Sequence, residues 1–301
     1  MSAATRKKKG TARFDELLEG CERGSDDVPH WRSIKARGFS GAGKTHYGLT
    51  YFAHEVESHG VKPEAALLCI LDCDFEGQRE LIVREDVIPK NLRPRILRKV
   101  CTEPEQVNDY ARAFIYAMRK HSEEYPEGVR VVIMENEGAF YLQCRDKYSL
   151  EVHGMSEGEL LLDRQKEAIS QGKKTLPTYE EGQMHAYKVI NKMFSDPFYR
   201  LKLACNSVGF DFISTVLLRE FTENYGTPQA KKSIRAQGRP DLTDPLFDWI
   251  VDFEVRQRTK SGNLQTQHLA VVRKSRECRP FRLRNPSQKR FWEAVAKSSG
   301  E

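Results

Sequence analysis

The residues with the clearest chemistry form one short glycine-rich run near the start of the chain. They are Gly38, Phe39, Ser40, Gly41, Ala42, Gly43, Lys44, Thr45 and the following His46. The run matches the pattern GxxxxGK[ST] at every specified position. Its glycines let backbone N–H groups turn toward a phosphate, and a helix starting there adds the positive end of its dipole. Lys44 can reach the terminal phosphates and Thr45 can offer a hydroxyl to Mg²⁺. The run therefore predicts a binding site for ATP with Mg²⁺.

A site of this kind needs a carboxylate at the end of a neighbouring buried strand. The segment VRVVIME (129–135) is expected to form a buried strand, and its four apolar residues 131–134 directly precede Glu135. We expect Glu135 to support the metal ion together with Thr45. Glu137 is the alternative, because period two would place it on the same strand face as Glu135.

A second acidic group follows another apolar run, LLCILDCDFEG. Period two places Asp72, Asp74 and Glu76 on one face if the strand continues that far. Three carboxylates fit better at the carboxyl end of a parallel strand, where ligands bind in open α/β sheets, than in a core. We expect Glu76 or Asp74 to orient an attacking water. The alternative is a solvated acidic loop that caps the next helix.

Periodicity predicts the elements that position these groups. We expect strands over 33–37, 65–74, 129–135 and 210–218, and helices over 44–60, 104–121 and 183–207, the last with a break near Asp196-Pro197. Two late strands, 249–259 and 265–275, are joined by a short turn and predict a hairpin. Alternating strands and helices with continuous apolar strands predict an α/β fold: a mostly parallel sheet flanked by helices, with a C-terminal antiparallel β hairpin.

The remaining segments lie outside this alternation. Residues 1–30 are basic and polar and predict a partly mobile extension, residues 141–178 are polar and predict an insertion, and residues 291–301 are interpreted as a tail. The main domain is expected over 31–290.

Composition excludes several classes of protein. The chain has 301 residues, of which 39% are hydrophobic and 31% charged, as in globular proteins. No run of 18 uncharged apolar residues is present, so no membrane span is expected. The seven cysteines form no CxxC pair and are interpreted as reduced thiols in a cytoplasmic protein. The net charge of +6 is concentrated late: residues 273–290 hold eight Lys or Arg against one Glu, which indicates either a polyanion-binding surface or a solvated segment.

Taken together, these motifs resemble the RecA-like NTPase family, and more closely the phage-type ATPases associated with single-strand annealing and recombination. The resemblance covers roughly residues 31–285. It implies a Walker A loop over Gly38–Thr45 and a Walker B strand ending in Glu135, where Asp is usual. It also implies that Glu76, within Asp74-Phe75-Glu76-Gly77, is the catalytic glutamate. A polar sensor residue is expected at Arg219 or Glu220.

The resemblance also assigns roles to basic residues. Lys274 and Arg276 match a basic-x-basic pair that reaches the nucleotide of a neighbouring subunit, which implies a homo-oligomeric ring or filament. A strand edge protected by charge is the simpler alternative for this pair. Lys231, Lys232, Arg235 and Arg239 lie in a segment, 229–239, that is interpreted as a mobile DNA-contacting loop or as a solvated surface loop. Phe221 and Tyr225, just before it, are candidates for stacking on bases.

The sequence thus predicts a RecA-like ATPase that acts on single-stranded nucleic acid, and DNA is the nucleic acid that we expect. Two other functions remain open. One is a P-loop kinase for a small metabolite, although such kinases usually lack a late hairpin that ends in a basic pair. The other is a nucleotide-dependent switch that assembles with a protein partner and hardly turns over, and the glutamate at position 135 keeps that alternative open.

Overall fold

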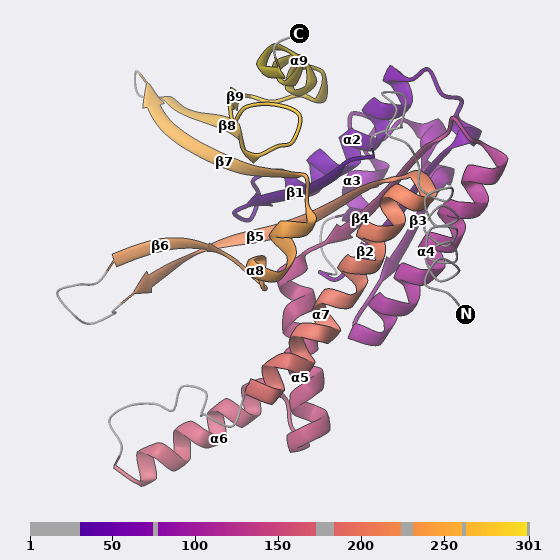
Figure 1. Ribbon diagram of the computed structural model, residues 1–301. Helices are drawn as coiled ribbons and strands as arrows, with labels where there is room; N and C mark the ends of the chain where they lie inside the picture. The colour runs from indigo at the N-terminus through magenta and orange to yellow at the C-terminus, as the bar shows by residue number, and fades with distance from the viewer. Residues whose placement is uncertain (1–30, 75–77, 173–183, 224–230, 261–262, 300–301) are drawn as a thin grey trace, which may run out of the picture. The chain divides into compact units, whose positions relative to one another are not determined.

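The computed structural model describes residues 31–74, 78–172, 184–223, 231–260 and 263–299. These residues form one sheet with helices on both faces (Figure 1). The predicted N-terminal extension, residues 1–30, lies outside the described residues. Within the described part, no helix is long and apolar enough to cross a membrane.

The sheet has the strand order β3-β2-β4-β5-β1-β7-β8-β9, and β6 pairs with β5 off this path. Six neighbouring strands run parallel, from β3 to β7, whereas β8 is antiparallel to both of its neighbours. The fold is thus α/β with a mostly parallel sheet. The strand bounds are β1 Ser33–Gly38, β2 Ala66–Asp72, β3 Ile96–Val100, β4 Val129–Glu135, β5 Asp211–Glu223, β6 Lys231–Ala236, β7 Trp249–Lys260, β8 Asn263–Lys274 and β9 Arg282–Arg284.

Successive side chains of each strand point to opposite faces of the sheet. The helices pack on both faces, so the molecule has two hydrophobic cores. One core joins Ile34, Ile70 and Ile133 of the sheet to α2 and α9, and the other joins Leu71, Val132 and Phe212 to α4, α5 and α7. The central strands β2 and β4 are buried on both faces, which explains their continuous apolar sequences. The helix bounds are α2 Lys44–Ser58, α3 Gln78–Val83, α4 Pro104–Glu124, α5 Glu137–His153, α6 Glu157–Ser170, α7 Met184–Ala204, α8 Pro240–Thr243 and α9 Gln288–Ser299.

This topology brings the predicted chemical groups to one edge of the sheet. The connection after β1 crosses one face through α2, whereas the connection after β4 crosses the other face through α5 and α7. The carboxyl ends of β1, β4 and β5 therefore meet where the connections diverge. Open α/β sheets bind their ligands at such a point.

Most predicted elements are confirmed, including the late hairpin formed by β7 and β8. Two predictions are wrong. The helix expected to break near Asp196-Pro197 is continuous, and α7 carries Pro197 in its interior. The expected mobile loop over 229–239 contains β6, which pairs with an extension of β5 beyond the predicted end at residue 218.

In three further segments, the structure has a strand or helices that the periodicity of the sequence did not predict. The strand β3 was missed because its residues are only partly buried at the sheet edge. The segment 141–178, expected as an insertion, supplies most of α5 and all of α6. Residues 291–299, interpreted as part of a tail, belong to α9, whose Phe291 and Val295 are buried in the core beside α2.

Candidate functional site

The glycine-rich run forms a tight loop between β1 and α2. Gly41 and Gly43 have φ values of 73° and 92°, in the left-handed region that favours glycine. The Ala42 amide donates to the Phe39 carbonyl oxygen at 3.1 Å, which closes the turn. Gly38 is required by close approach, because a Cβ there would lie 2.6 Å from the Phe253 carbonyl oxygen on β7. The loop has the backbone geometry that the sequence pattern demands.

Lys44 is the first residue of α2 and reaches back across this loop. Its Nζ donates to the Phe39 carbonyl oxygen at 3.0 Å. Burial lowers its pKa, while the carboxylates of Glu135 and Asp74 act in the opposite direction. A partly desolvated ammonium beside a glycine loop binds an anion more strongly than an exposed lysine does.

Thr45 and Glu135 meet as expected. The Thr45 hydroxyl donates to Glu135 Oε1 at 2.5 Å, although the two residues are 90 positions apart in sequence. Glu135 is only 6% exposed, and its second oxygen is buried without a hydrogen-bond partner among the described residues. Desolvation raises its pKa to about 7, against the hydrogen bonds from Thr45 and Thr215.

This carboxylate and hydroxyl fit a hard divalent cation. Mg²⁺ prefers oxygen ligands, and it usually binds to one or two carboxylates and takes its remaining ligands from phosphates and water. The unpartnered oxygen of Glu135 is the kind of buried polar atom that such an ion would satisfy. Within the described part of the chain, no group of three or more His, Cys, Asp or Glu side chains is arranged to hold a metal by itself.

The second acidic group divides into residues with different surroundings. Asp72 ends β2, is fully buried, and accepts from Arg98 Nε on β3 at 3.0 Å, so it is part of an ion pair between strands. Asp74 lies beyond the strand and accepts from Asn136 Nδ2 at 2.5 Å. Glu76 lies outside the described residues.

Two polar residues of this site were not anticipated. Asn136 follows Glu135 with φ 60°, caps α5 by accepting from the Ala139 amide, and positions Asp74. The backbone amide of Asn136 donates to Thr215 Oγ1 on β5 at 2.9 Å. Asn adopts the left-handed backbone conformation more readily than most residues. The Asn that directly follows the strand was therefore the sequence signal that could have indicated a sharp turn at this position. Thr215 occupies the place beside Glu135, whereas Arg219 and Glu220 lie further along β5, opposite Arg235 and Ile234 of β6.

The interpretation of Glu137 as an alternative metal ligand on the same strand face is wrong. The strand β4 ends at Glu135, and Glu137 begins α5 on the opposite side of the sheet. There it pairs with fully buried Lys35 of β1, with 3.0 Å between Nζ and Oε2, and accepts from Thr243 Oγ1 at 2.5 Å. Lys35 also donates to Asp244 at 2.6 Å.

Lys274 and Arg276 both have partners within the chain. Lys274 Nζ donates to the carbonyl oxygens of Asp244 and Phe247 at 3.2 and 2.6 Å. Arg276 Nε lies 2.9 Å from Asp248 Oδ1, and its side chain is 63% exposed. The two residues therefore differ. Lys274 holds the turn between α8 and β7, whereas the mostly exposed side chain of Arg276 pairs with the buried carboxylate of Asp248.

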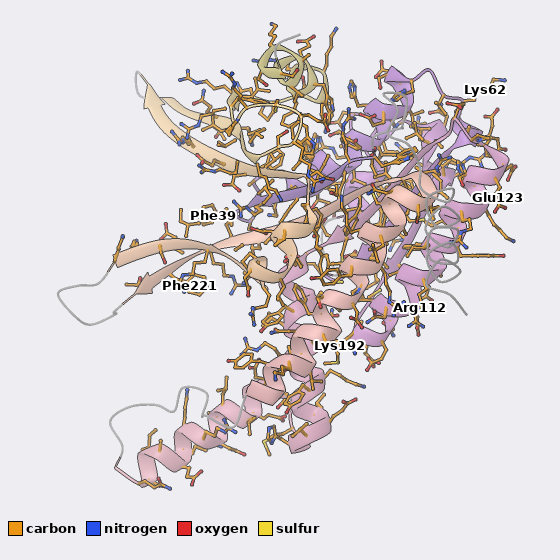
Figure 2. All side chains as sticks on the ribbon, in the orientation of Figure 1. Phe39, Lys62, Arg112, Glu123, Lys192 and Phe221 are labelled. Atoms are coloured by element: carbon orange, nitrogen blue, oxygen red, sulfur yellow. The ribbon has the colours of Figure 1, made fainter. Side chains whose placement is uncertain are left out.

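The basic segment 231–239 is divided between the two faces of a ribbon formed by β6 and the end of β5. Residues directly opposite each other share a face, so Lys231, Arg235 and Phe221 lie on one side and Lys232 lies on the other, 3.4 Å from Glu220. Figure 2 shows Phe221 on the ribbon; its side chain is 44% exposed. The Arg235 guanidinium lies 5.8 Å from the Phe221 ring centroid. Arg239 lies at the base of the ribbon, paired with Asp241 at 2.6 Å.

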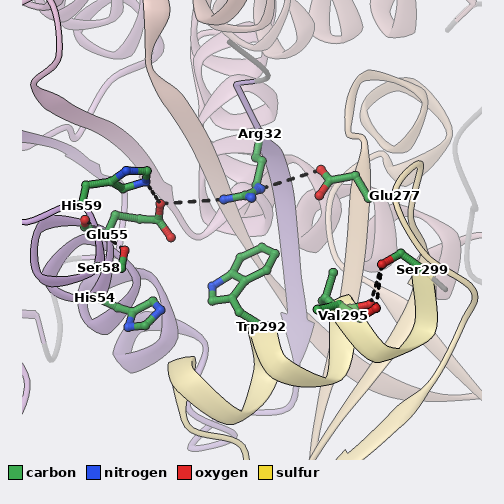
Figure 3. A pocket seen from close by; sticks show the side chains of 10 residues that line it. Arg32, His54, Glu55, Ser58, His59, Glu277, Trp292, Val295 and Ser299 are labelled. Carbon is green, nitrogen blue, oxygen red and sulfur yellow. Dashed lines mark hydrogen bonds and ion pairs between the residues drawn. The ribbon is translucent and has the colours of Figure 1, made fainter. Parts of the chain in front are cut away.

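Two cavities flank β1. One, of about 840 Å³, opens directly from the glycine-rich loop. The other, of about 580 Å³, lies at the amino end of β1 around Arg32 (Figure 3). There the Arg32 guanidinium lies 4.3 Å from the Trp292 ring centroid, between Glu55 and Glu277 at 3.7 Å each, so its charge is already balanced.

The described cysteines are free thiols, and five of the six are buried. Burial raises the pKa of Cys69 and Cys144, which makes these thiols poor nucleophiles.

Compared with protein-family models and with curated protein sequences, the chain matches none. The assignment of a function therefore depends on the geometry of the loop and its neighbouring carboxylate.

Proposed function

We propose that this protein is a RecA-like P-loop ATPase that acts on single-stranded nucleic acid. One observation carries the proposal: a GxxxxGKT loop at the head of α2 presents Thr45 directly to Glu135. This buried carboxylate ends the parallel strand β4, which β5 separates from β1. Loop, lysine, hydroxyl and carboxylate are the parts that hold a nucleoside triphosphate with its metal ion.

Each residue has a defined task in this proposal. Lys44 exchanges its bond to the Phe39 carbonyl oxygen for the terminal phosphates of ATP, and the amides of the loop donate to the same phosphates. Thr45 and Glu135 hold Mg²⁺, which neutralises charge that develops on the phosphates. Glu76 accepts a hydrogen bond from the attacking water, and Asp74, oriented by Asn136, is the candidate for that task within the described residues.

The ribbon is the proposed contact to nucleic acid. The face that carries Lys231, Arg235 and Phe221 combines positive charge with an exposed aromatic ring. Cations bind phosphates without regard to sequence, and an aromatic ring stacks on any base. Lys231 and Arg235 share the face of the ribbon that carries Phe221, whereas Lys232 lies on the other face, so we assign the contact to Lys231 and Arg235.

Arg276 is the better candidate for a residue that completes a neighbour's site in a ring or filament. Its side chain is 63% exposed, and Asp248 keeps hydrogen bonds from Lys202 and Ser33 when Arg276 turns to another subunit. Lys274 would have to leave two carbonyl oxygens that it binds within its own chain. We expect Arg276→Ala to bind ATP normally and to hydrolyse it more slowly. Wild-type turnover in this variant would rule out that Arg276 completes the site of a neighbouring subunit.

ATP hydrolysis by the purified protein, with and without single-stranded DNA at low salt, tests the proposal. Lys44→Ala serves as the blank. Several-fold stimulation by single strands is the expected result. Hydrolysis indifferent to nucleic acid would favour a kinase or a protein-remodelling role. Bound ATP without hydrolysis would favour the assembly switch.

The ribbon can be tested within the same assay. Lys231→Ala should weaken DNA binding and reduce its salt dependence, because one phosphate contact is removed. Lys232→Ala is the matched control: the same change of charge on the opposite face, next to Glu220. Equal losses in both variants would show that only net charge matters.

A further inference from the structure

The base of the ribbon formed by β6 and the end of β5 packs directly against the start of α5. A Cβ on Gly138, the second residue of α5, would lie only 2.5 Å from Gln237 Cβ, so glycine is required there for the two segments to meet. The backbone amide of Gln237 donates to the Leu217 carbonyl oxygen on β5 at 2.8 Å, and Gly238 adopts φ 84° beside Glu137. The ribbon therefore ends in contact with the turn between β4 and α5.

The side chain of Gln237 also holds an exposed arginine of the ribbon. Arg219 on β5 lies directly opposite Arg235 on β6, so it shares the ribbon face that carries Lys231 and Phe221. In the amide orientation that satisfies its hydrogen bonds, Gln237 accepts from both terminal nitrogens of the Arg219 guanidinium at 3.1 Å each. A cation on the face proposed to contact nucleic acid is thus held by a neutral group at the base of the ribbon.

The other side of this contact leads to the candidate functional site. A Cβ on Gly138 would lie 3.4 Å from Asn136 Oδ1, so Asn136 borders the place where Gln237 packs. Asn136 Nδ2 donates to Asp74 Oδ2 at 2.5 Å, and Asn136 directly follows Glu135 in the chain. A movement of Gln237 therefore changes the surroundings in which Asn136 holds Asp74.

A phosphate bound on the ribbon competes with Gln237 for Arg219. The phosphate carries a full negative charge and can accept two parallel bonds from a guanidinium, whereas the amide oxygen carries only a partial charge. Gln237 thus has two arrangements, one held by Arg219 and one released. A ligand shifts such an equilibrium only by binding one arrangement more tightly, and a phosphate at Arg219 binds the released one.

We propose that Gln237 is a positioning residue for Asp74, which it affects through its contact with Gly138 and Asn136. Nucleic acid bound at Arg219 releases Gln237 and thereby changes the rate of ATP hydrolysis. The inference rests on the proposed function, because it takes the ribbon as the nucleic-acid contact and Asp74 as part of the site. It goes further by adding Arg219 to that contact and by naming the side chain that connects the ribbon to the site.

Two measurements on the full chain test the inference: ATP hydrolysis over a series of single-stranded DNA concentrations, and the affinity for a fluorescently labelled oligothymidylate by anisotropy. Gln237→Ala removes the oxygen that holds Arg219 and keeps the Cβ against Gly138. Gln237→Glu is the conservative variant, because it keeps an oxygen for Arg219. Gln165→Ala, at an exposed position on α6, is the matched control.

We expect single strands to stimulate hydrolysis by the wild type and by Gln165→Ala several-fold. Gln237→Ala should hydrolyse ATP equally fast with and without single strands, while it binds the oligothymidylate as tightly as the wild type does. Gln237→Glu should reach full stimulation but need more DNA, because its charge competes with phosphate for Arg219. If Gln237→Ala shows no cooperative unfolding transition, the raised DNA requirement of Gln237→Glu decides the test.

Three results would overturn the inference alone. They are wild-type stimulation of Gln237→Ala, a loss of stimulation in Gln237→Glu as well, and a loss of DNA affinity in Gln237→Ala that accounts for its lost stimulation. The last would mean that Gln237 only supports the ribbon. Wild-type hydrolysis that is indifferent to single strands would overturn the nucleic-acid contact of the proposed function, and the inference with it.

Discussion

Glu135 and Glu137 are two positions apart and almost equally buried, but they lie in opposite kinds of surroundings. Glu137 faces a buried lysine and a threonine hydroxyl on the α5 side of the sheet, and every partner it needs is supplied by the chain. Glu135 faces the phosphate loop, where Thr45 bonds one oxygen and the other has no partner among the described residues. Desolvation raises the pKa of both carboxyls.

The difference separates a carboxylate whose partners are all supplied by the chain from one that is incompletely bonded among the described residues. A closed, fully bonded pair rigidifies the junction of β1, α5 and the turn after α8. An incompletely bonded buried carboxylate is costly to the folded state, and such groups are found where a ligand or metal supplies the missing interaction. Two variants, a pH series and a pair of hydroxyl deletions test this distinction.

The largest expected effect is on stability at the closed site. Glu137→Ala removes one of the two carboxylates that hold fully buried Lys35 and leaves only Asp244. Because breaking a buried pair costs about 3–5 kcal/mol of unfolding free energy when no partner remains, we expect a loss at or below about 3 kcal/mol. Urea denaturation measures the loss. Glu123→Ala, an exposed carboxylate on α4, is the control and should change stability by less than about 0.5 kcal/mol. A loss of unfolding free energy in Glu137→Ala no greater than in this control would mean that the ion pair between Glu137 and Lys35 does not stabilise the fold.

The open site should respond in activity instead. Glu135→Gln keeps the volume and the hydrogen bond to Thr45 but removes the negative charge. We expect ATP hydrolysis to fall about 100-fold, because metal coordination stabilises the transition state by several kcal/mol, while the unfolding midpoint at pH 7.5 stays the same or rises. Steady-state kinetics with saturating Mg²⁺ provide the measurement. Unchanged turnover would remove Glu135 from the site.

The pH dependence of stability sharpens the comparison. The pKa of Glu135 rises from an ordinary 4.5 to about 7 in the folded protein, so between these values the folded state binds the proton more tightly than the unfolded state. Its contribution to stability is therefore present below about pH 4.5 and is lost as pH rises through about 7, by about 3 kcal/mol in total. Urea unfolding at a series of pH values, compared between wild type and Glu135→Gln, isolates this contribution. Parallel curves for the two proteins would contradict it.

The smallest effects concern neighbouring hydroxyls on β5, each directed at one of the two glutamates. Ser214 Oγ donates to Glu137 over a long 3.4 Å, so Ser214→Ala should cost less than about 1 kcal/mol and leave turnover unchanged. Thr215→Val leaves the backbone amide of Asn136 without its acceptor, which should lower the free energy of unfolding by about 1–3 kcal/mol. Because Asn136 also holds Asp74, the variant should lower turnover several-fold by displacing Asp74. Thermal unfolding and kinetics on the two variants together measure the contrast. Equal effects on turnover would mean that the two glutamates are not functionally separate.

Part of the site could be predicted because it is local. Gly41, Gly43, Lys44 and Thr45 act through backbone conformation and a helix start, which are set within a few residues. The assignment of Glu135 as the end of a buried strand followed from an uninterrupted apolar run. Asn136 was missed because its role depends on a left-handed backbone conformation and on an Asp 62 positions earlier in the chain.

Other residues were misplaced because their partners come from distant segments. Period two predicted that Glu137 shares a face with Glu135, but the strand ends between them and the chain turns into α5. The basic residues 231–239 gave no alternating apolar pattern, because the ribbon has no buried face, so a loop was expected where β6 forms.

The amino-acid sequence by itself determined the conformation of the glycine-rich loop, the alternation of strands and helices, and the burial of the central strands. These depend on the torsional preferences and hydrophobicity of neighbouring residues. The tertiary structure alone decided which glutamate faces the loop, that Lys274 bonds within its own chain, and that the C-terminal segment closes a cavity beside Lys44. Those contacts join residues such as Lys35 and Glu137, 102 positions apart, and they depend on which strands the folded sheet makes neighbours.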